Sequence, residues 1–179
     1  PWTSRWAAGR TRGSASATLA GGPFGGETDT YQFQLRASQF VPLWFDHVIN
    51  LRGWTSMIQE YGSSDRVPIF DRLFAGGPRT LRGFKFRKVG PKDETEEPIG
   101  GRSVATATVE YTAPVVDKVR LALFYDAGIV WQEIFRKDLD NPAVGDGIFC
   151  DDYGFGVRFD FPSFPIQLDY AWPINTDDV

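Results

Sequence analysis

The residues best suited to do chemistry in this chain are one arginine and two acids. Arg82 lies in a long segment, 62–100, between the apolar residues Leu81 and Phe84. A segment this apolar is expected to fold back against the protein, which removes the guanidinium from water and makes carboxylate partners necessary. Glu110 and Asp126 are nearby acids on the polar faces of predicted strands, and one planar guanidinium can serve two carboxylates. The alternative is that Arg82 is one of several solvated loop cations.

Other reactive residues are few. The chain has one histidine, His47, and one cysteine, Cys150, which excludes an internal disulfide and a metal centre built on two histidines or on cysteines. A Ser–His hydrolase site would have to use His47, which the strand pattern places at a short turn. Asp151 and Asp152 are a weak carboxylate pair, because neighbouring residues of a strand point to opposite faces. We therefore expect no catalytic residue, no metal and no cofactor, although an outer-membrane lipase or protease remains an alternative.

The elements that must position these residues read as β-strands. Residues 118–131 alternate in period two, with Leu121, Leu123 and Tyr125 on an apolar face and Arg120 and Asp126 on a polar one. High glycine content and 15% aromatic residues also favour an all-β chain. Seven segments show the alternation: 6–20, 31–43, 47–61, 102–115, 118–131, 153–161 and 164–174.

The lengths of the strands and of their connections indicate a membrane barrel. Strands of soluble proteins usually run about 5–6 residues, whereas these run about 10–15 and a tilted strand needs about 9–11 to cross a bilayer. Short connections (40–47, 114–118, 161–164) alternate with long ones (20–30, 62–100, 132–150), as in outer-membrane barrels. Seven strands would leave two open edges in hydrocarbon. The sequence thus predicts an incomplete portion of a membrane-spanning, antiparallel up-and-down β-barrel.

Net charge and hydropathy limit the classes of partner and of membrane segment that this chain can have. The formal net charge is −4 without a basic stripe in the sequence, which argues against nucleic acid as a partner. No run of about 18 apolar residues occurs, so a transmembrane helix is not expected. A soluble all-β binding module is a further alternative.

The loop residues resemble a known family. Residues 69–84, with Gly76 and Gly77 followed by Leu81-Arg82-Gly83-Phe84, resemble the sixth extracellular loop of the BamA family, whose hallmark there is (V/I/L)-R-G-(F/Y). The family is the barrel component of the bacterial outer-membrane protein assembly machinery. Its second motif, F-x-D-x-G, is matched by Phe124, Asp126 and Gly128, and its acidic residue on the preceding strand by Glu110.

This resemblance implies most of the functional expectations. It implies that 1–179 is a partial transmembrane barrel domain, about seven strands of a roughly sixteen-stranded barrel, without the POTRA repeats and the closing strand. It implies that Arg82 enters the lumen and pairs with Glu110 and Asp126. It also implies an integral protein of the bacterial outer membrane that folds and inserts other outer-membrane proteins without nucleotide. The implied partners are membrane lipids, unfolded clients, accessory lipoproteins and the remainder of its own barrel, and the alternative is a polypeptide-secretion barrel of the TamA or two-partner secretion type.

Overall fold

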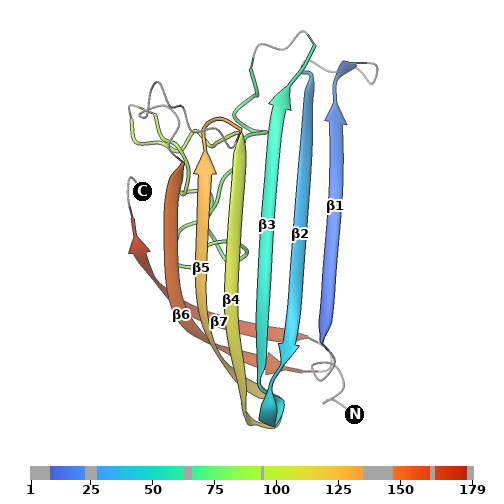
Figure 1. The fold of residues 1–179 in the computed structure, drawn as a ribbon. Coiled ribbons are helices and arrows are strands. Elements are labelled where there is room, and N and C mark those ends of the chain that lie inside the picture. Colours follow the sequence, from blue (N-terminus) through green and yellow to red (C-terminus); the bar gives the residue numbers. More distant parts are fainter. Residues whose placement is uncertain are drawn as a thin grey trace.

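The described part of the chain forms seven antiparallel strands, which make one open sheet in sequence order (Figure 1). The computed structural model describes residues 9–22, 28–62, 66–93, 95–134, 147–161 and 164–176. A short 3₁₀ turn, η3 (Trp44–Asp46), lies between the second and third strands. The strands are β1 (Arg10–Ala20), β2 (Thr30–Pro42), β3 (Val48–Glu60), β4 (Ser103–Val116), β5 (Val119–Trp131), β6 (Ile148–Asp160) and β7 (Pro165–Asn175). The predicted all-β, up-and-down arrangement is therefore confirmed.

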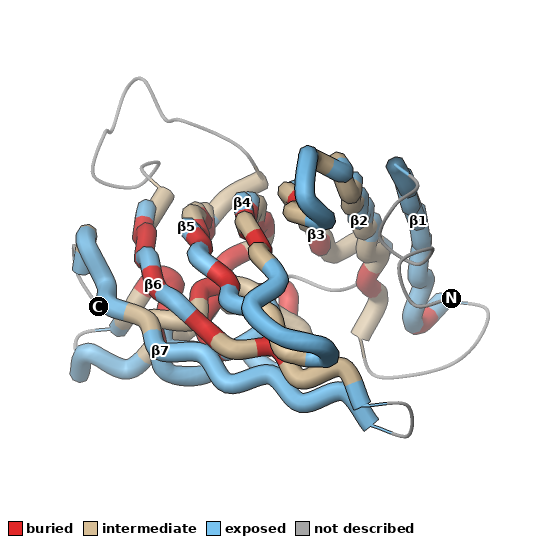
Figure 2. The backbone as a smooth tube through the Cα atoms, turned by 90° about the horizontal axis from the view of Figure 1, so that it is seen from below, coloured by how far each residue is buried: buried red, intermediate tan, exposed pale blue. Residues whose placement is uncertain are grey.

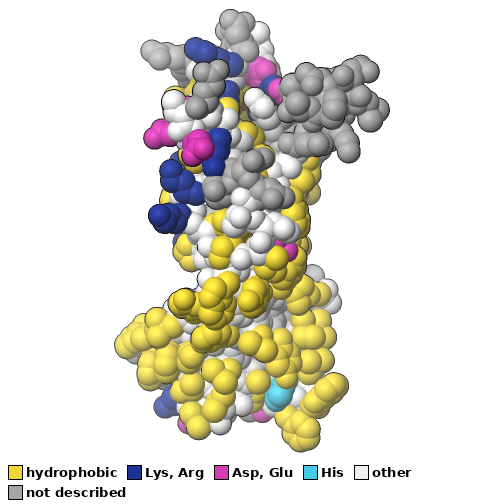
Figure 3. Space-filling view, turned by 90° about the vertical axis from the view of Figure 1, so that its left-hand side faces the viewer, with side chains coloured by type: hydrophobic (Ala, Val, Ile, Leu, Met, Phe, Trp, Pro, Cys, Tyr) yellow, Lys and Arg dark blue, Asp and Glu magenta, His cyan; other side chains and the backbone are white. Residues whose placement is uncertain are grey.

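The sheet carries its apolar side chains on the exposed face. On β5, Leu121, Leu123 and Tyr125 are exposed, whereas Phe124 and Asp126, which alternate with them, are buried. This is the phase predicted from the sequence, and it places hydrophobic residues where a soluble sheet would place polar ones. Figure 3 shows hydrophobic side chains over much of the lower part of the molecule and charged ones gathered in the upper part. Such an outward apolar face suits contact with lipid.

Short and long connections alternate along the sheet. Residues 43–47 join β2 to β3, 117–118 join β4 to β5, and 161–164 join β6 to β7. The other three connections, 21–29, 61–102 and 132–147, are longer. No helix formed by the described residues is long and apolar enough to cross a membrane.

The start of β6 differs from the prediction. The strand begins at Ile148, so Cys150 is a fully buried strand residue and does not lie in the preceding loop. Asp151 and Asp152 are both buried, at a point where the register between β6 and β7 shifts. Asp151 accepts a hydrogen bond from the Tyr125 hydroxyl at 2.6 Å, which satisfies a carboxylate that would otherwise face the apolar side. Such irregularities interrupt a simple alternation of faces, which is why the sequence pattern placed the strand start later.

The long connection after β3 lies against the sheet and builds the core with it. In Figure 1 it appears as green segments behind β4–β6. Leu73 pairs with Gly101 and Ala75 with Val89, so the segment forms its own short bridges. Figure 2 shows that β1 is exposed along its length, as the exposure of its residues confirms. The buried cluster consists of Ile58, Val67, Leu73, Ala75, Leu81, Phe84, Val89, Val104, Val130 and Cys150.

Candidate functional site

Two consecutive glycines shape the loop around Arg82. Gly76 and Gly77 both have φ of 100°, a left-handed conformation that favours glycine. The Gly77 N–H donates to the carbonyl oxygens of Leu81 (2.9 Å) and Phe84 (3.0 Å). These bonds close residues 77–84 into a compact turn that holds the Arg82 backbone against the sheet.

Apolar contacts anchor the turn on both sides of Arg82. Leu81 is fully buried and Phe84 is 8% exposed. An ideal Cβ built on Gly128 of β5 would lie 3.2 Å from Leu81 Cδ1, so the glycine gives the leucine its space. Burying a leucine side chain contributes roughly 1.5–3 kcal/mol, and the anchor therefore fixes the depth at which the loop sits.

The backbone of Gly83 approaches β6 closely. A Cβ at this position would lie 2.7 Å from Asp152 Cβ and 3.2 Å from the Pro173 nitrogen. A side chain at residue 83 would therefore require backbone movement. Glycine in the Leu81-Arg82-Gly83-Phe84 motif is required here by this contact distance.

The Arg82 side chain reaches two acids on adjacent strands. Its Nε donates to Asp126 Oδ2 at 2.7 Å and its Nη2 to Asp126 Oδ1 at 2.9 Å, which is a bidentate pair. Its Nη1 donates to Glu110 Oε2 at 2.7 Å. The guanidinium carbon also lies 3.4 Å from the centre of the Phe124 ring. The Arg82 side chain is 5% exposed and that of Asp126 is fully buried, so solvent screens this pair little.

The structure adds residues that the sequence did not single out. Arg158 of β6 donates from Nη2 to Glu110 Oε2 at 2.9 Å and from Nη1 to Asp169 Oδ1. Asp169 of β7 lies 3.4 Å from Arg82 Nη1, and Arg52 of β3 lies 3.8 Å from Glu110 Oε2. The available signal was the phase of these residues, since Arg158 and Asp169 fall on the polar faces of their strands. Their cross-strand partners depend on register, which the sequence does not specify.

The site is a network of paired opposite charges. Among the described residues, no three His, Cys, Asp or Glu side chains are placed to hold a metal ion together. The arrangement can hold a loop in one position because the buried charges on both sides are paired. Removing one partner of such a pair leaves an uncompensated buried charge, which costs about 3–5 kcal/mol.

Comparisons with known sequences all point to one superfamily. An Omp85 superfamily domain matches residues 10–179. The outer membrane protein assembly factor BamA of Nitratidesulfovibrio vulgaris is 28% identical over 171 residues, which cover 92% of this chain and 21% of that protein. BamA of Neisseria meningitidis serogroup B is 28% identical over 178 residues, covering 84% and 22%. A SAM50-like protein of Drosophila melanogaster is 31% identical over 148 residues, covering 77% and 31%.

A solved structure agrees with these sequences. BamA from Haemophilus ducreyi lacking POTRA domains 1–3 superposes with a TM-score of 0.78 at 26% identity, over 94% of this chain and 36% of that one. The chain spans about a fifth of the length of the two BamA proteins. The superfamily match over residues 10–179 includes β1–β7 and the long loop between β3 and β4. The chain belongs to the Omp85 superfamily and forms part of an integral β-barrel of the outer membrane.

Proposed function

We propose that the protein containing this chain folds and inserts other β-barrel proteins into the outer membrane, without nucleotide and without covalent catalysis. Similarity to the two outer membrane protein assembly factors supports this proposal. The partners that it implies are membrane lipids, unfolded barrel clients and accessory lipoproteins of an assembly complex. The single observation that carries the role of this chain is the engagement of Arg82 by Asp126 and Glu110 on the inner face of the sheet.

The role of this chain is to brace one side of the barrel. Arg82 contacts β4 through Glu110, β5 through Asp126 and β7 through Asp169. Arg158 of β6 contacts two of these acids, Glu110 and Asp169. A loop bonded to these strands opposes their separation. Insertion of a client by pairing with an exposed strand edge requires that the barrel open at one seam and stay closed elsewhere. The network lies within β3–β7 and stabilises this region while the seam opens outside it.

The test compares Arg82→Ala with Lys85→Ala in the full-length protein. Lys85 is an exposed cation of the same loop, so its replacement changes the charge equally without touching the network. We expect Arg82→Ala to unfold at lower temperature on heat-modifiability gels and to insert an unfolded barrel client into liposomes several-fold more slowly. Normal unfolding temperature and normal insertion in Arg82→Ala would contradict the proposal.

Secretion of a single passenger is the alternative function in this superfamily. Depletion of the full-length protein distinguishes the two functions. An assembly factor is required for many barrel proteins, so their levels in the outer membrane should fall together. Loss of one secreted polypeptide with unchanged barrel proteins would support the secretion function instead.

A further inference from the structure

The inner face of the sheet is divided by charge. One row of paired residues runs across the strands: Arg12 of β1, Ser38 of β2, Arg52 of β3, Thr108 of β4, Asp126 of β5 and Asp152 of β6. The β1–β3 end of this row is basic and the β5–β6 end is acidic. The acidic end is met by Arg82 of the loop, as described above. The basic end is not met by a carboxylate of the loop among the described residues.

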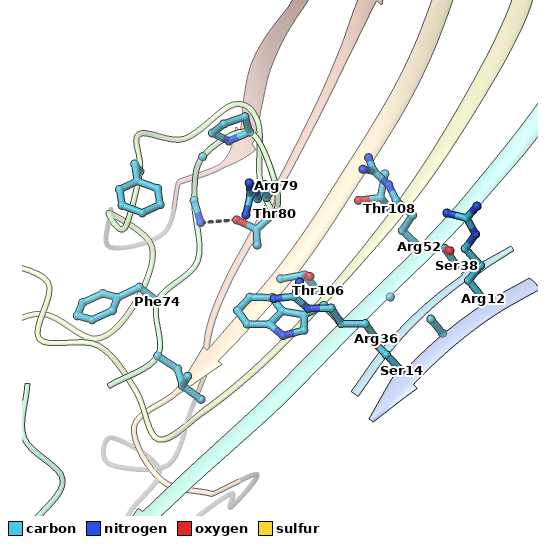
Figure 4. Close-up of a pocket in the computed structure, with 18 of the residues that line it drawn as sticks. Arg12, Ser14, Arg36, Ser38, Arg52, Phe74, Arg79, Thr80, Thr106 and Thr108 are labelled. Atoms are coloured by element: carbon cyan, nitrogen blue, oxygen red, sulfur yellow. Dashed lines mark hydrogen bonds between the residues drawn. The ribbon is translucent and has the colours of Figure 1, made fainter. Parts of the chain in front are cut away.

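A cleft of about 1170 Å³ lies over the basic end. Figure 4 shows Arg12, Arg36 and Arg52 on the strand side and Arg79 on the loop side. We call this space the arginine cleft. None of the described residues that line it is an aspartate or a glutamate. Six arginines are found among the lining residues that the structure describes: Arg12, Arg36, Arg52, Arg72, Arg79 and Arg87.

The cleft arginines have few counter-charges within the part of the chain that the structure describes. Arg52 lies 3.8 Å from Glu110 Oε2, but this oxygen also pairs with Arg82 and Arg158, so one carboxylate is shared among three arginines. Arg36 lies over the Trp54 ring at 5.7 Å and Arg87 over the Phe74 ring at 4.1 Å, contacts that leave the charge uncompensated. Six like charges around one cleft create a positive potential that attracts anions.

We propose that the arginine cleft binds an acidic segment of another polypeptide. Its arginines are spread over β1, β2 and β3 and the facing loop, and alternate strands lie about 10 Å apart, so one small anion cannot reach them together. An extended segment of consecutive acidic residues presents carboxylates on both of its sides, about 6.6–6.8 Å apart along each side. It can therefore contact both walls, each by a bidentate arginine–carboxylate pair.

The position of the cleft favours polypeptide over lipid as the source of these carboxylates. The cleft lies on the inner face of the sheet, and on β2 and β3 the alternating residues Leu35 and Leu51 are exposed on the opposite, apolar face. Lipid chains contact the apolar face, so the headgroups attached to them also lie on the outer side of the sheet. Trp54, Phe74 and Phe86 also line the cleft and offer apolar contacts that a polypeptide side chain can use.

The test measures binding of a fluorescein-labelled oligoglutamate peptide to the full-length protein by fluorescence anisotropy. The cleft variant is Arg12→Gln/Arg36→Gln. The control variant Arg66→Gln/Lys118→Gln removes the same charge at positions outside the cleft. We expect Kd to rise at least about tenfold, or ~1.4 kcal/mol, in the cleft variant and to change less than about twofold in the control. We also expect the affinity to fall as NaCl is raised, because salt screens exposed charges.

A further variant tests the loop wall of the cleft, and a separate measurement tests whether each variant is folded. Arg79→Gln/Arg87→Gln changes the loop wall alone, and it should weaken binding as well if both walls contact the peptide. Heat-modifiability gels verify that each variant is folded. The proposal is overturned if the full-length protein does not bind the peptide, or if both variants lose affinity equally. Displacement of the peptide by inorganic phosphate, or by phosphatidylglycerol vesicles at the same charge concentration, would also overturn it.

Discussion

Replacing Asp126 by alanine should loosen the loop from the sheet and destabilise the barrel. Asp126 is fully buried and accepts three bonds from Arg82: Nε at 2.7 Å, Nη2 at 2.9 Å and the backbone N–H at 3.4 Å. The substitution deletes the bidentate partner and leaves the guanidinium in a site that is almost closed to water. We therefore expect a loss far larger than that of an exposed ion pair, which is about 0–1 kcal/mol.

The size of the expected stability loss in Asp126→Ala depends on the contacts that Arg82 keeps. Two charge-assisted hydrogen bonds contribute roughly 1.5–3 kcal/mol each. Glu110 at 2.7 Å and Asp169 at 3.4 Å still hold Arg82 Nη1, so the arginine keeps a counter-charge. The expected cost is about 3–4 kcal/mol, in the lower part of the range for breaking a buried pair. In the double variant Arg82→Ala/Asp126→Ala the arginine is also removed, so the combined cost should fall about 2 kcal/mol short of the sum.

The assay is urea-induced unfolding of the full-length protein in liposomes, followed by tryptophan fluorescence. Asp117→Ala is the matched control, since Asp117 is an exposed acid in the turn between β4 and β5. A cost below about 1 kcal/mol for Asp126→Ala, or single-variant costs that add within about 0.5 kcal/mol, would refute the idea that Arg82 and Asp126 act as one buried unit.

Two further predictions concern the turn around Arg82, and a third concerns Asp93 elsewhere in the same loop. Gly83→Ala should cost roughly 2 kcal/mol or more because its Cβ would lie 2.7 Å from Asp152 Cβ, and faster protease cleavage within 66–93 would report the displaced loop. Leu81→Ala should cost about 2–5 kcal/mol and should speed maleimide labelling of Cys150, which is buried in the same cluster; an unchanged labelling rate would count against a shared core. Hydrogen bonds from the Thr95 hydroxyl and from the backbone N–H groups of Glu97 and Thr95 lower the pKa of the Asp93 carboxyl. The stability that these hydrogen bonds give the turn is present above the ordinary aspartate pKa and is lost as the pH falls through the lowered pKa. Carbon NMR should therefore show the Asp93 carboxyl titrating at a lower pH than a typical aspartate.

The strands were predictable because apolar and polar residue types alternate along each one and so indicate which side chains share a face. Leu121, Leu123 and Tyr125 recur every second residue, and the same face is exposed in the structure. The start of β6 was not predictable because Asp151 interrupts the pattern. Its charge is satisfied by a cross-strand hydrogen bond from Tyr125 at 2.6 Å. The alternation of residue types within one segment cannot predict a hydrogen-bond partner that lies on another strand.

The candidate site divides in the same way. Arg82, Glu110 and Asp126 could be nominated from residue type and loop length, and their contacts in the structure are short. Arg158 could not be paired from the sequence, because its acceptor Glu110 lies two strands away, on β4. The arginine cleft was equally hidden. Its cations come from three strands and a loop, so no basic stripe appears along the chain.

The locked loop and the arginine cleft are coupled through charge. The same loop that donates Arg82 to the acidic end of the sheet also brings Arg79 and Arg87 opposite Arg12 and Arg36. These like charges repel, so Leu81 and Arg82 must hold the loop against that repulsion. An acidic segment in the cleft would remove the repulsion and would bind the docked loop more tightly than the released one. By linkage, such a ligand stabilises the docked state, and the oligoglutamate peptide should therefore protect the loop of the full-length protein from protease.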